Sequence, residues 1–121
     1  MKRIGLLLLA VVLVVGLAGC PGGGGNRDAD PVGTWVTTYD WSCNGSTGLM
    51  TWHVYATGTF ASSEGDGGIW SVNKNDFTLA YTTAGSDAVY LGAVDNDRMA
   101  GTMSSPGSTG CWSAQRTSTT P

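Results

Sequence analysis

The stretch GTWVTTYDW, residues 33–41, decides the fold class because its large side chains alternate with smaller and polar ones. One face of this extended chain would carry Trp35, Thr37, Tyr39 and Trp41. Similar alternation returns between clusters of Gly, Ser, Asn and Asp, and residues 32–116 show no apolar pattern with the helical period. The pattern predicts eight strands, at residues 33–41, 49–56, 59–63, 68–73, 76–82, 88–94, 98–104 and 111–116.

Many short, regularly spaced strands are typical of a β-sandwich or a β-barrel. The short connections favour antiparallel pairing of consecutive strands, and an even number of strands lets the first and the last run antiparallel side by side. The sequence therefore predicts an all-β fold, an eight-stranded antiparallel up-and-down barrel over residues 32–117 with a polar tail at 118–121. Closure of the sheet removes the exposed edges that invite aggregation.

The N-terminus has the pattern of an export signal. A cationic head at residues 1–3 precedes an apolar run at 4–18, which is shorter than the roughly 20 residues that a bilayer-spanning helix needs. The junction LAGC, residues 17–20, resembles the lipobox of bacterial lipoproteins. This resemblance implies a signal peptide at residues 1–19 and attachment of a lipid, with acyl chains such as palmitate, to Cys20. The alternative is an ordinary signal peptide with a chance cysteine.

Residues 20–31 are predicted to link the lipid to the barrel, because PGGGGNRDAD at 21–30 is rich in glycine and polar residues. The lipoprotein resemblance implies a protein anchored at the cell envelope, where two or more acyl chains hold it stably in a membrane. Pro21 stands where inner-membrane lipoproteins of diderm bacteria commonly carry Asp. This favours the outer membrane if the cell has one.

The charge balance excludes two classes of partner. Six Lys and Arg stand against nine Asp and Glu, and removal of residues 1–19 would take away Lys2 and Arg3. Nucleic-acid binding needs a basic surface, and anionic lipid attracts basic clusters. We therefore expect no nucleic-acid partner and no binding of anionic lipid through the barrel surface.

The motif GTW at residues 33–35 resembles the G-x-W that opens the first strand of lipocalins, and Arg116 in CWSAQR matches their late arginine. The motifs GTF (58–60), GIW (68–70) and GTM (101–103) are similar to those of small bacterial lipocalin-like lipoprotein domains. The resemblance covers about residues 33–116. Together with antiparallel pairing of the terminal strands, it implies that Arg116 lies over the Trp35 indole in a cation–π contact. Avidin-type barrels also begin with G-T-W, but their biotin-contacting Asn and Ser would fall near Thr37 and Trp41, so that binding chemistry is not implied.

If Cys20 carries lipid, Cys43 and Cys111 remain as an even pair in an exported protein, which favours a disulfide. Pairing of the terminal strands brings the two cysteines together, as a disulfide requires. The alternatives are two free thiols or a metal pair. Two Cys and His53 at no ligand spacing make a poor zinc set, and we predict no metal and no cofactor.

The predicted connections alternate between two ends of the barrel. Short ones fall at 57–58, 74–75 and 95–97, and longer ones at 43–48, 64–67, 83–87 and 105–110. The tetrapeptide GSTG occurs in two of the longer ones, at 45–48 and 107–110, and predicts similar turns. Both ends of the barrel chain fall at the short-turn end, so the longer loops are expected to point away from the membrane.

Loops on a rigid scaffold commonly carry function, so the longer-loop end is the candidate binding rim. Its predicted residues are Trp41, Asn44, Ser46, Glu64, Asp66, Asp87 and Trp112. The alternative is a set of solvated turns above a filled interior, because eight strands enclose a space that side chains just fill. The side chains expected to fill it are Trp52, Phe60, Trp70 and Phe77.

Catalytic chemistry is not predicted. His53 falls on the expected outer face and has no nucleophile-elbow motif or cysteine partner. Asp95 and Asp97 fit a hairpin turn better than a calcium loop. Asp40 with an acidic residue of the 64–67 loop could imitate a glycosidase carboxylate pair, but by spacing alone.

Two functions are expected. The first is a non-enzymatic, membrane-anchored envelope lipoprotein that binds a small apolar ligand or an envelope partner through its loop rim. The alternative is a structural or assembly protein of the envelope with a filled core and no small-molecule ligand. A ligand-sized void inside the barrel favours the first, and a filled interior favours the second.

Overall fold

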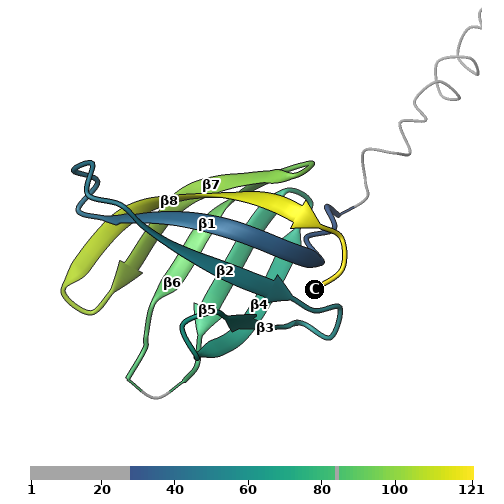
Figure 1. Cartoon of the computed structure of the whole chain (residues 1–121), viewed down its shortest axis with the longest axis horizontal. Helices are drawn as coiled ribbons and strands as arrows, with labels where there is room; N and C mark the ends of the chain where they lie inside the picture. The colour runs from purple at the N-terminus through teal and green to yellow at the C-terminus, as the bar shows by residue number, and fades with distance from the viewer. Residues whose placement is uncertain (1–27, 84) are drawn as a thin grey trace, which may run out of the picture.

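The predicted up-and-down barrel is present in the computed structural model, which describes residues 28–83 and 85–121. Eight antiparallel strands follow one another around a closed barrel in chain order (Figure 1). The strands are β1 (Gly33–Trp41), β2 (Gly48–Val54), β3 (Thr59–Ser62), β4 (Gly67–Asn73), β5 (Asp76–Tyr81), β6 (Val89–Asp95), β7 (Arg98–Ser105) and β8 (Ser108–Ser118). The predicted signal peptide, Cys20 and the linker up to residue 27 lie outside the described residues. In the described part of the chain, no helix has the length and apolar character needed to cross a bilayer.

The first and last strands close the barrel. β1 pairs with β8 in antiparallel register, with Asp40 opposite Cys111 and Trp35 opposite Arg116. The end of β1 therefore meets the start of β8, and a disulfide joins Cys43 to Cys111 with their Cα atoms 5.3 Å apart. The predicted disulfide is confirmed.

Two connections differ from the sequence-based expectation. β7 and β8 stay paired as far as Ser105 opposite Ser108, so the turn consists of Pro106 and Gly107 alone. The longer loop expected at 105–110 is wrong because its polar residues find partners across the hairpin. The two GSTG segments are consequently dissimilar, since 108–110 belong to β8 whereas 45–47 lie in the β1–β2 connection. At the other end of the barrel, β2 stops at Val54, and residues 55–58 form the turn to β3.

Aromatic side chains fill the barrel interior. The Trp52 ring is fully buried, with its centroid 5.1 Å from that of Tyr90, 5.4 Å from Trp112 and 6.2 Å from Phe60. These separations lie in the range of about 4.5–7 Å that aromatic pairs favour. Phe77 is buried as expected. The other expected core aromatic, Trp70, is only partly buried and stacks on Phe77 at 6.4 Å.

Arg116 joins three segments at the end of the barrel where β1 begins and β8 ends. Its guanidinium donates hydrogen bonds to the carbonyls of Asp30 at 2.7 Å, Val32 at 3.0 Å and Asn96 at 3.0 Å, and its Nε pairs with Asp97 at 2.8 Å. A planar guanidinium has five donors in a fixed fork, which suits it to several acceptors at once. One side chain thus fastens the entering chain, the β6–β7 turn and β8 to one another.

Residues 28–31 pack against this same end, although the sequence placed them in the linker. Pro31 is buried and accepts a hydrogen bond from Trp35 Nε1 at 2.8 Å, and Ala29 N donates to the carbonyl of Lys74 at 2.7 Å. A buried indole N–H needs an acceptor, and the Pro31 carbonyl supplies it. The packed part of the chain therefore extends at least to Asp28.

Candidate functional site

The connections divide the barrel into two ends (Figure 1). We call the end that carries the β1–β2, β3–β4, β5–β6 and β7–β8 connections the mouth end. The opposite, terminal end carries the other three connections, the start of β1 and the end of β8. The longest connections, 42–47 and 82–88, both lie at the mouth end. The predicted alternation of the connections between two ends is confirmed.

A hollow of about 210 Å³ opens at the mouth end. Aromatic and acidic side chains form most of its wall: Tyr39, Trp41, Glu64, Asp66, Tyr81 and Tyr90. These residues come from β1, β5, β6 and the β3–β4 connection, so only barrel closure brings them together. The hollow lies above the packed core, because the Tyr81 hydroxyl accepts a hydrogen bond from the buried Trp52 Nε1 at 2.9 Å.

Burial and negative charge raise the pKa of the three tyrosines of the hollow. Burial raises the pKa of Tyr81 from its usual 10.0 to about 12. Burial also raises the pKa of Tyr90, and the charges of Tyr81 and Glu64 act in the same direction. The nearby Glu64 carboxylate raises the pKa of Tyr39, which donates a hydrogen bond to Glu64 Oε2 at 3.3 Å. The wall thus offers neutral phenols, with raised pKa values, beside the side chains of Glu64 and Asp66.

One carboxylate oxygen of the hollow has no partner. Asp66 Oδ1 is buried, and none of the described residues donates a hydrogen bond to it. Buried polar atoms in folded proteins nearly always have a partner, so this oxygen is an exception, as is Thr37 Oγ1 in the barrel interior. The Glu64 side chain is exposed at the edge of the same hollow.

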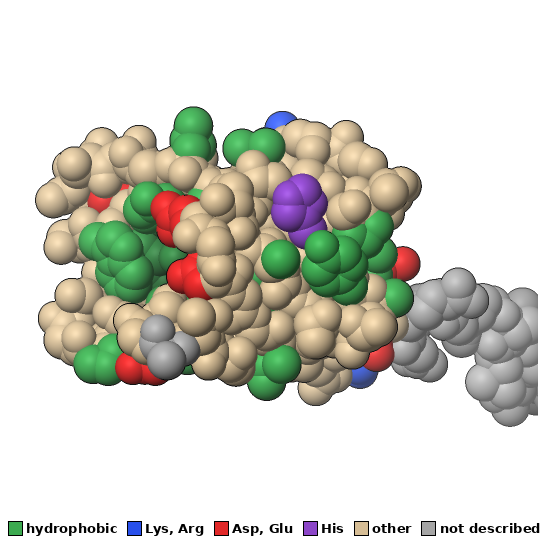
Figure 2. Space-filling model, turned by 60° about the horizontal axis from the view of Figure 1, so that its bottom comes forward, with side chains coloured by type: hydrophobic (Ala, Val, Ile, Leu, Met, Phe, Trp, Pro, Cys, Tyr) green, Lys and Arg blue, Asp and Glu red, His purple; other side chains and the backbone are tan. Residues whose placement is uncertain are grey.

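Among the charged residues of the described chain, only acidic ones lie at the mouth end. Four acidic residues lie at the mouth end: Asp40, Glu64, Asp66 and Asp87. All three Lys and Arg of the described part lie towards the terminal end, where the other five acidic residues also lie: Lys74, Arg98 and Arg116 beside Asp28, Asp30, Asp76, Asp95 and Asp97. Figure 2 shows acidic side chains beside a hydrophobic patch on the left of the view, whereas further right Lys and Arg appear together with other acidic side chains. The mouth end thus carries negative charge that no nearby Lys or Arg of the described chain offsets.

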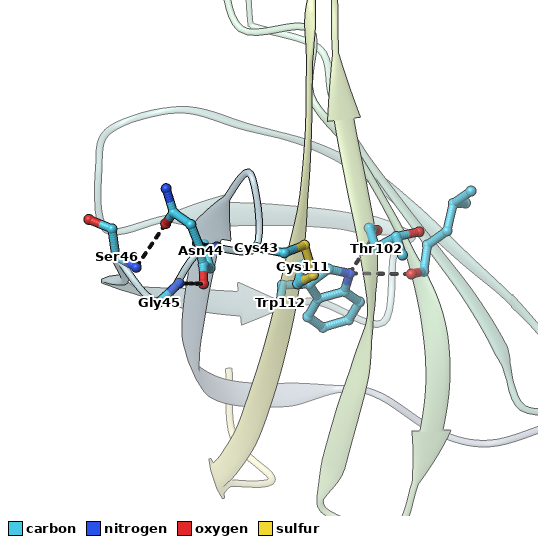
Figure 3. Close-up of a disulfide and its surroundings, with 9 residues drawn as sticks. Cys43, Asn44, Gly45, Ser46, Thr102, Cys111 and Trp112 are labelled. Carbon is cyan, nitrogen blue, oxygen red and sulfur yellow. Dashed lines mark hydrogen bonds between the residues drawn. A yellow bond between two sulfur atoms is a disulfide. The ribbon is translucent and has the colours of Figure 1, made fainter.

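The structure brings together part of the predicted rim. Trp41, Glu64 and Asp66 line the hollow, and Asp87 is exposed between two other lining residues. Asn44 and Ser46 instead belong to the turn beside the disulfide, where Asn44 Oδ1 accepts a hydrogen bond from the Ser46 backbone N at 3.0 Å (Figure 3). These two residues therefore shape the loop and do not line the hollow.

Asp40 organises the same loop and is not free to act as half of a carboxylate pair. Its two carboxylate oxygens accept hydrogen bonds from the backbone N of Asn44 at 3.1 Å and of Gly45 at 2.8 Å. Ser42 and Cys43 adopt positive φ values of 78° and 50°, which few non-glycine residues do. The carboxylate stabilises this tight reversal next to the disulfide.

Trp112 lies inside the barrel and not at the rim. Only 4% of it is exposed, and its Nε1 donates hydrogen bonds to the carbonyls of Thr102 at 2.9 Å and Leu91 at 3.2 Å (Figure 3). Gly101 stands opposite Trp112 and Gly92 opposite Gly101, so no side chain of β7 or β6 blocks the indole from these carbonyls. Trp112 is a core residue because two glycines leave room for its ring.

Sequence reasoning did not assign the three tyrosines to the site. Tyr39, Tyr81 and Tyr90 alternate correctly for inward-facing residues, which by itself predicts core. Their position near the mouth end of each strand is the signal that separates site from core. The Tyr39 hydroxyl donates a hydrogen bond to Glu64, and the ring centroids of Tyr81 and Tyr90 are 5.8 Å apart.

The remaining candidates for chemistry stay apart from the hollow. His53 is partly exposed on β2, with Nδ1 3.4 Å from Thr34 Oγ1. Asp95 and Asp97 flank the β6–β7 turn, where Asn96 has a φ of 55° and Asp97 pairs with Arg116. Within residues 28–83 and 85–121, no three His, Cys, Asp or Glu side chains gather in an arrangement that could hold a metal ion.

A second, larger hollow of about 510 Å³ lies on the outer face of β1, β8, β7 and β6. Small side chains form its floor: Thr38, Ala93, Ala100 and Ser113, which stand side by side on the four strands. Val36, Arg98 and Gln115 border it.

No protein-family model matches the chain, and no curated protein matches its sequence.

Proposed function

We propose that this protein is a lipid-anchored, non-enzymatic binding module of the bacterial cell envelope, with a lipocalin-like barrel that takes a small, partly apolar ligand at its mouth end. The lipobox-like LAGC at 17–20 supports the anchor, and GTW with Arg116 supports the lipocalin likeness. The aromatic and acidic hollow of about 210 Å³ carries the binding proposal. Because buried aromatic side chains fill the barrel interior below this hollow, the ligand binds at the mouth end and not deep inside the barrel.

The orientation of the barrel supports a role at the envelope surface. Asp28 and the start of β1 lie at the terminal end, so a lipid on Cys20 leaves the mouth end facing away from the membrane. Pro21 in place of Asp favours the outer membrane of a diderm cell. An exposed hollow on a tethered domain is suited to capture of ligands from the surrounding fluid.

Cys20→Ala tests the anchor. We expect the parent protein to partition with membranes after cell lysis and the variant to appear in the soluble fraction. Ser71→Ala, at an exposed position of β4, is the control and should partition with membranes like the parent protein. Equal membrane partition of the parent and Cys20→Ala would refute anchoring through Cys20.

NMR spectroscopy of the ¹⁵N-labelled protein, anchored in lipid nanodiscs, tests binding at the mouth. We expect small water-soluble aromatic probes such as indole and 2-phenylethanol to shift the resonances of Trp41, Tyr81 and Tyr90. Ser86→Trp fills the hollow from the β5–β6 connection and should abolish these shifts, whereas Ser71→Trp on the exposed side of β4 should leave them unchanged. Absence of any shift at the mouth with every probe would refute the ligand-binding function.

A structural or assembly role is the second candidate, and the filled interior together with the outer hollow of about 510 Å³ favours it. In that role a partner protein packs on the outer face of β6–β8. Site-specific photocrosslinking from position 100 in cells should then capture one defined partner, while crosslinking from position 71 should not. Recovery of no specific adduct from position 100 counts against the assembly role.

A further inference from the structure

We infer that the ligand taken at the mouth end is a small organic cation whose ammonium group points at Asp66 and Glu64 and whose apolar part lies against the aromatic wall. This inference rests on the proposed function, because it names the ligand class of the same hollow. It goes beyond that function by excluding neutral and anionic ligands of the same size as preferred occupants.

The wall combines the two kinds of group that attract an organic cation. Glu64 and Asp66 supply carboxylates, and Tyr39, Trp41 and Tyr81 supply aromatic rings. The negative faces of aromatic rings attract ammonium groups, most strongly when the cation is partly removed from water. An anion at this place would meet two carboxylates and no described Lys or Arg. The lining therefore selects by the sign of the charge.

The unpartnered oxygen of Asp66 is a second, independent indication. Asp66 Oδ1 is buried without a donor among the described residues, and its neighbour Tyr81 already donates its hydroxyl proton to Met50 Sδ at 3.3 Å. A rotation of the partly exposed Asp66 side chain would turn this oxygen towards the hollow, where an ammonium N–H would donate to it in a charge-assisted hydrogen bond, which is stronger than a bond between neutral groups. A hydroxyl donor from a neutral ligand gains less at the same position.

The uncompensated negative charge of the mouth end acts in the same direction. The four carboxylates of the mouth end face no Lys or Arg in the described chain, whereas Lys74, Arg98 and Arg116 lie towards the terminal end. A cleft lined by charges of one sign concentrates counter-ions and accelerates their binding. The mouth therefore attracts cations before any contact is made.

Size and ligand geometry favour an organic cation over a metal ion. The hollow of about 210 Å³ is smaller than the roughly 300–1,000 Å³ of pockets for drug-sized ligands, so it suits one charged head and a short apolar group. Calcium and magnesium need about six oxygen ligands, but no group of three metal-ligating side chains occurs in the described residues. The tyrosine and tryptophan rings of this wall can instead attract an ammonium group through cation–π contacts.

Titration with three probes of one size tests the inference: 2-phenylethylammonium, the neutral 2-phenylethanol and the anionic phenylacetate. NMR shifts of the mouth residues in the nanodisc-anchored protein give each dissociation constant. We expect the ammonium to bind about tenfold tighter than the alcohol, a difference of about 1.4 kcal/mol, and phenylacetate not to bind. The advantage of the ammonium should shrink as salt screens the carboxylates.

Charge-removing variants locate the effect. Asp66→Asn and Glu64→Gln should each weaken the binding of 2-phenylethylammonium about fivefold and leave the dissociation constant of 2-phenylethanol unchanged. Asp76→Asn removes the same charge at the terminal end and should change neither of these two dissociation constants. Asp66 loses no hydrogen bond to a described residue on this substitution, so the variant should fold normally.

The outcomes separate the two claims. Binding of 2-phenylethanol at the mouth as tightly as the ammonium overturns the cation inference and leaves the proposed function standing. Equal loss of ammonium binding in Asp76→Asn also overturns the inference, because it assigns the preference to net charge. Failure of all three probes to shift the resonances of the mouth residues overturns the inference. The proposed function is then refuted only if indole and the other small aromatic probes also cause no shift at the mouth.

Discussion

Arg116 and Trp35 are direct partners across the β1–β8 ladder, and the guanidinium carbon of Arg116 lies 4.9 Å from the centroid of the Trp35 ring. The same pair of strands is joined near the mouth end by the Cys43–Cys111 disulfide, which spans 68 residues of sequence. The seam that closes the barrel is therefore held at both ends by contacts between side chains that are far apart in the sequence. The Arg116 contacts and the disulfide lead to separate predictions.

Replacement of Arg116 by Lys should destabilise the barrel even though the charge remains. Lys cannot serve the carbonyls of Asp30, Val32 and Asn96 together, so we expect the free energy of unfolding to fall by about 1–3 kcal/mol. Urea unfolding measures this loss. Arg98→Lys at an exposed position is the control and should change stability by less than about 0.5 kcal/mol. Equal stability of both variants would show that charge alone holds the seam.

Loss of the disulfide should lower stability more than any single hydrogen bond does. The double variant Cys43→Ser, Cys111→Ser removes a link that closes a long loop, worth about 4 kcal/mol in the chain-entropy model. The urea midpoint should fall, and the reduced parent protein should unfold like the variant. Peptide mapping without reductant should recover the two cysteines in one linked pair of peptides, and separate peptides would contradict the closed seam.

Gly92 should not tolerate a side chain. A methyl group at this position would lie 2.8 Å from Trp112 Cζ2 and would also press on the carbonyl of Ala100. We expect Gly92→Ala to lower the free energy of unfolding by about 1–3 kcal/mol, as overpacking in cores does. The adjacent, exposed Ala93→Ser is the control. Thermal unfolding followed by near-UV circular dichroism of the tryptophans reports both, and an unchanged midpoint for Gly92→Ala would contradict the packing of Trp112 across β7 and β6.

Stability should decline at alkaline pH because tyrosines are buried in the protonated form. Burial raises the pKa of Tyr81 from 10.0 to about 12 and raises that of Tyr90 as well. In the unfolded chain these phenols release their protons near pH 10, so the stabilisation is complete below that pH and is lost as the pH rises towards and beyond 12. Tyr90→Phe removes one such group and should flatten the decline. Tyr55→Phe, at an exposed position, should leave it unchanged, and urea unfolding at pH 8 to 12 distinguishes the two.

The extent of prediction from sequence differs between the fold and the site. The alternation of residues 33–41 predicted β1 with its observed bounds, Gly33–Trp41, because side-chain period is a local property of an extended chain. Pairing of the first and last strands followed from the even number of short strands, and it correctly placed Cys43 beside Cys111. The β7–β8 loop was wrong because serine, threonine and glycine are common in turns but pair equally well in a hairpin whose partner strand is long.

The site was less accessible to sequence reasoning. Proximity to a strand end predicted that Trp41, Glu64 and Asp66 lie at the rim, where they line the hollow, but it also predicted a rim position for the buried Trp112. Whether an inward residue near a strand end lines a hollow or enters the core depends on what stands beside it on neighbouring strands. For Trp112 those neighbours are Gly101 on β7 and Gly92 on β6. The linear sequence does not show that these residues stand beside Trp112.

The sequence by itself therefore determined that eight strands form, how side chains alternate along β1 and which strands meet at the seam, since period and chain connectivity act locally or through simple counting. Only the tertiary structure decided that three tyrosines from β1, β5 and β6 surround the carboxylates of the β3–β4 connection. Curvature and register of the closed sheet set those distances. They result from the packing of all eight strands together, and no single segment encodes them.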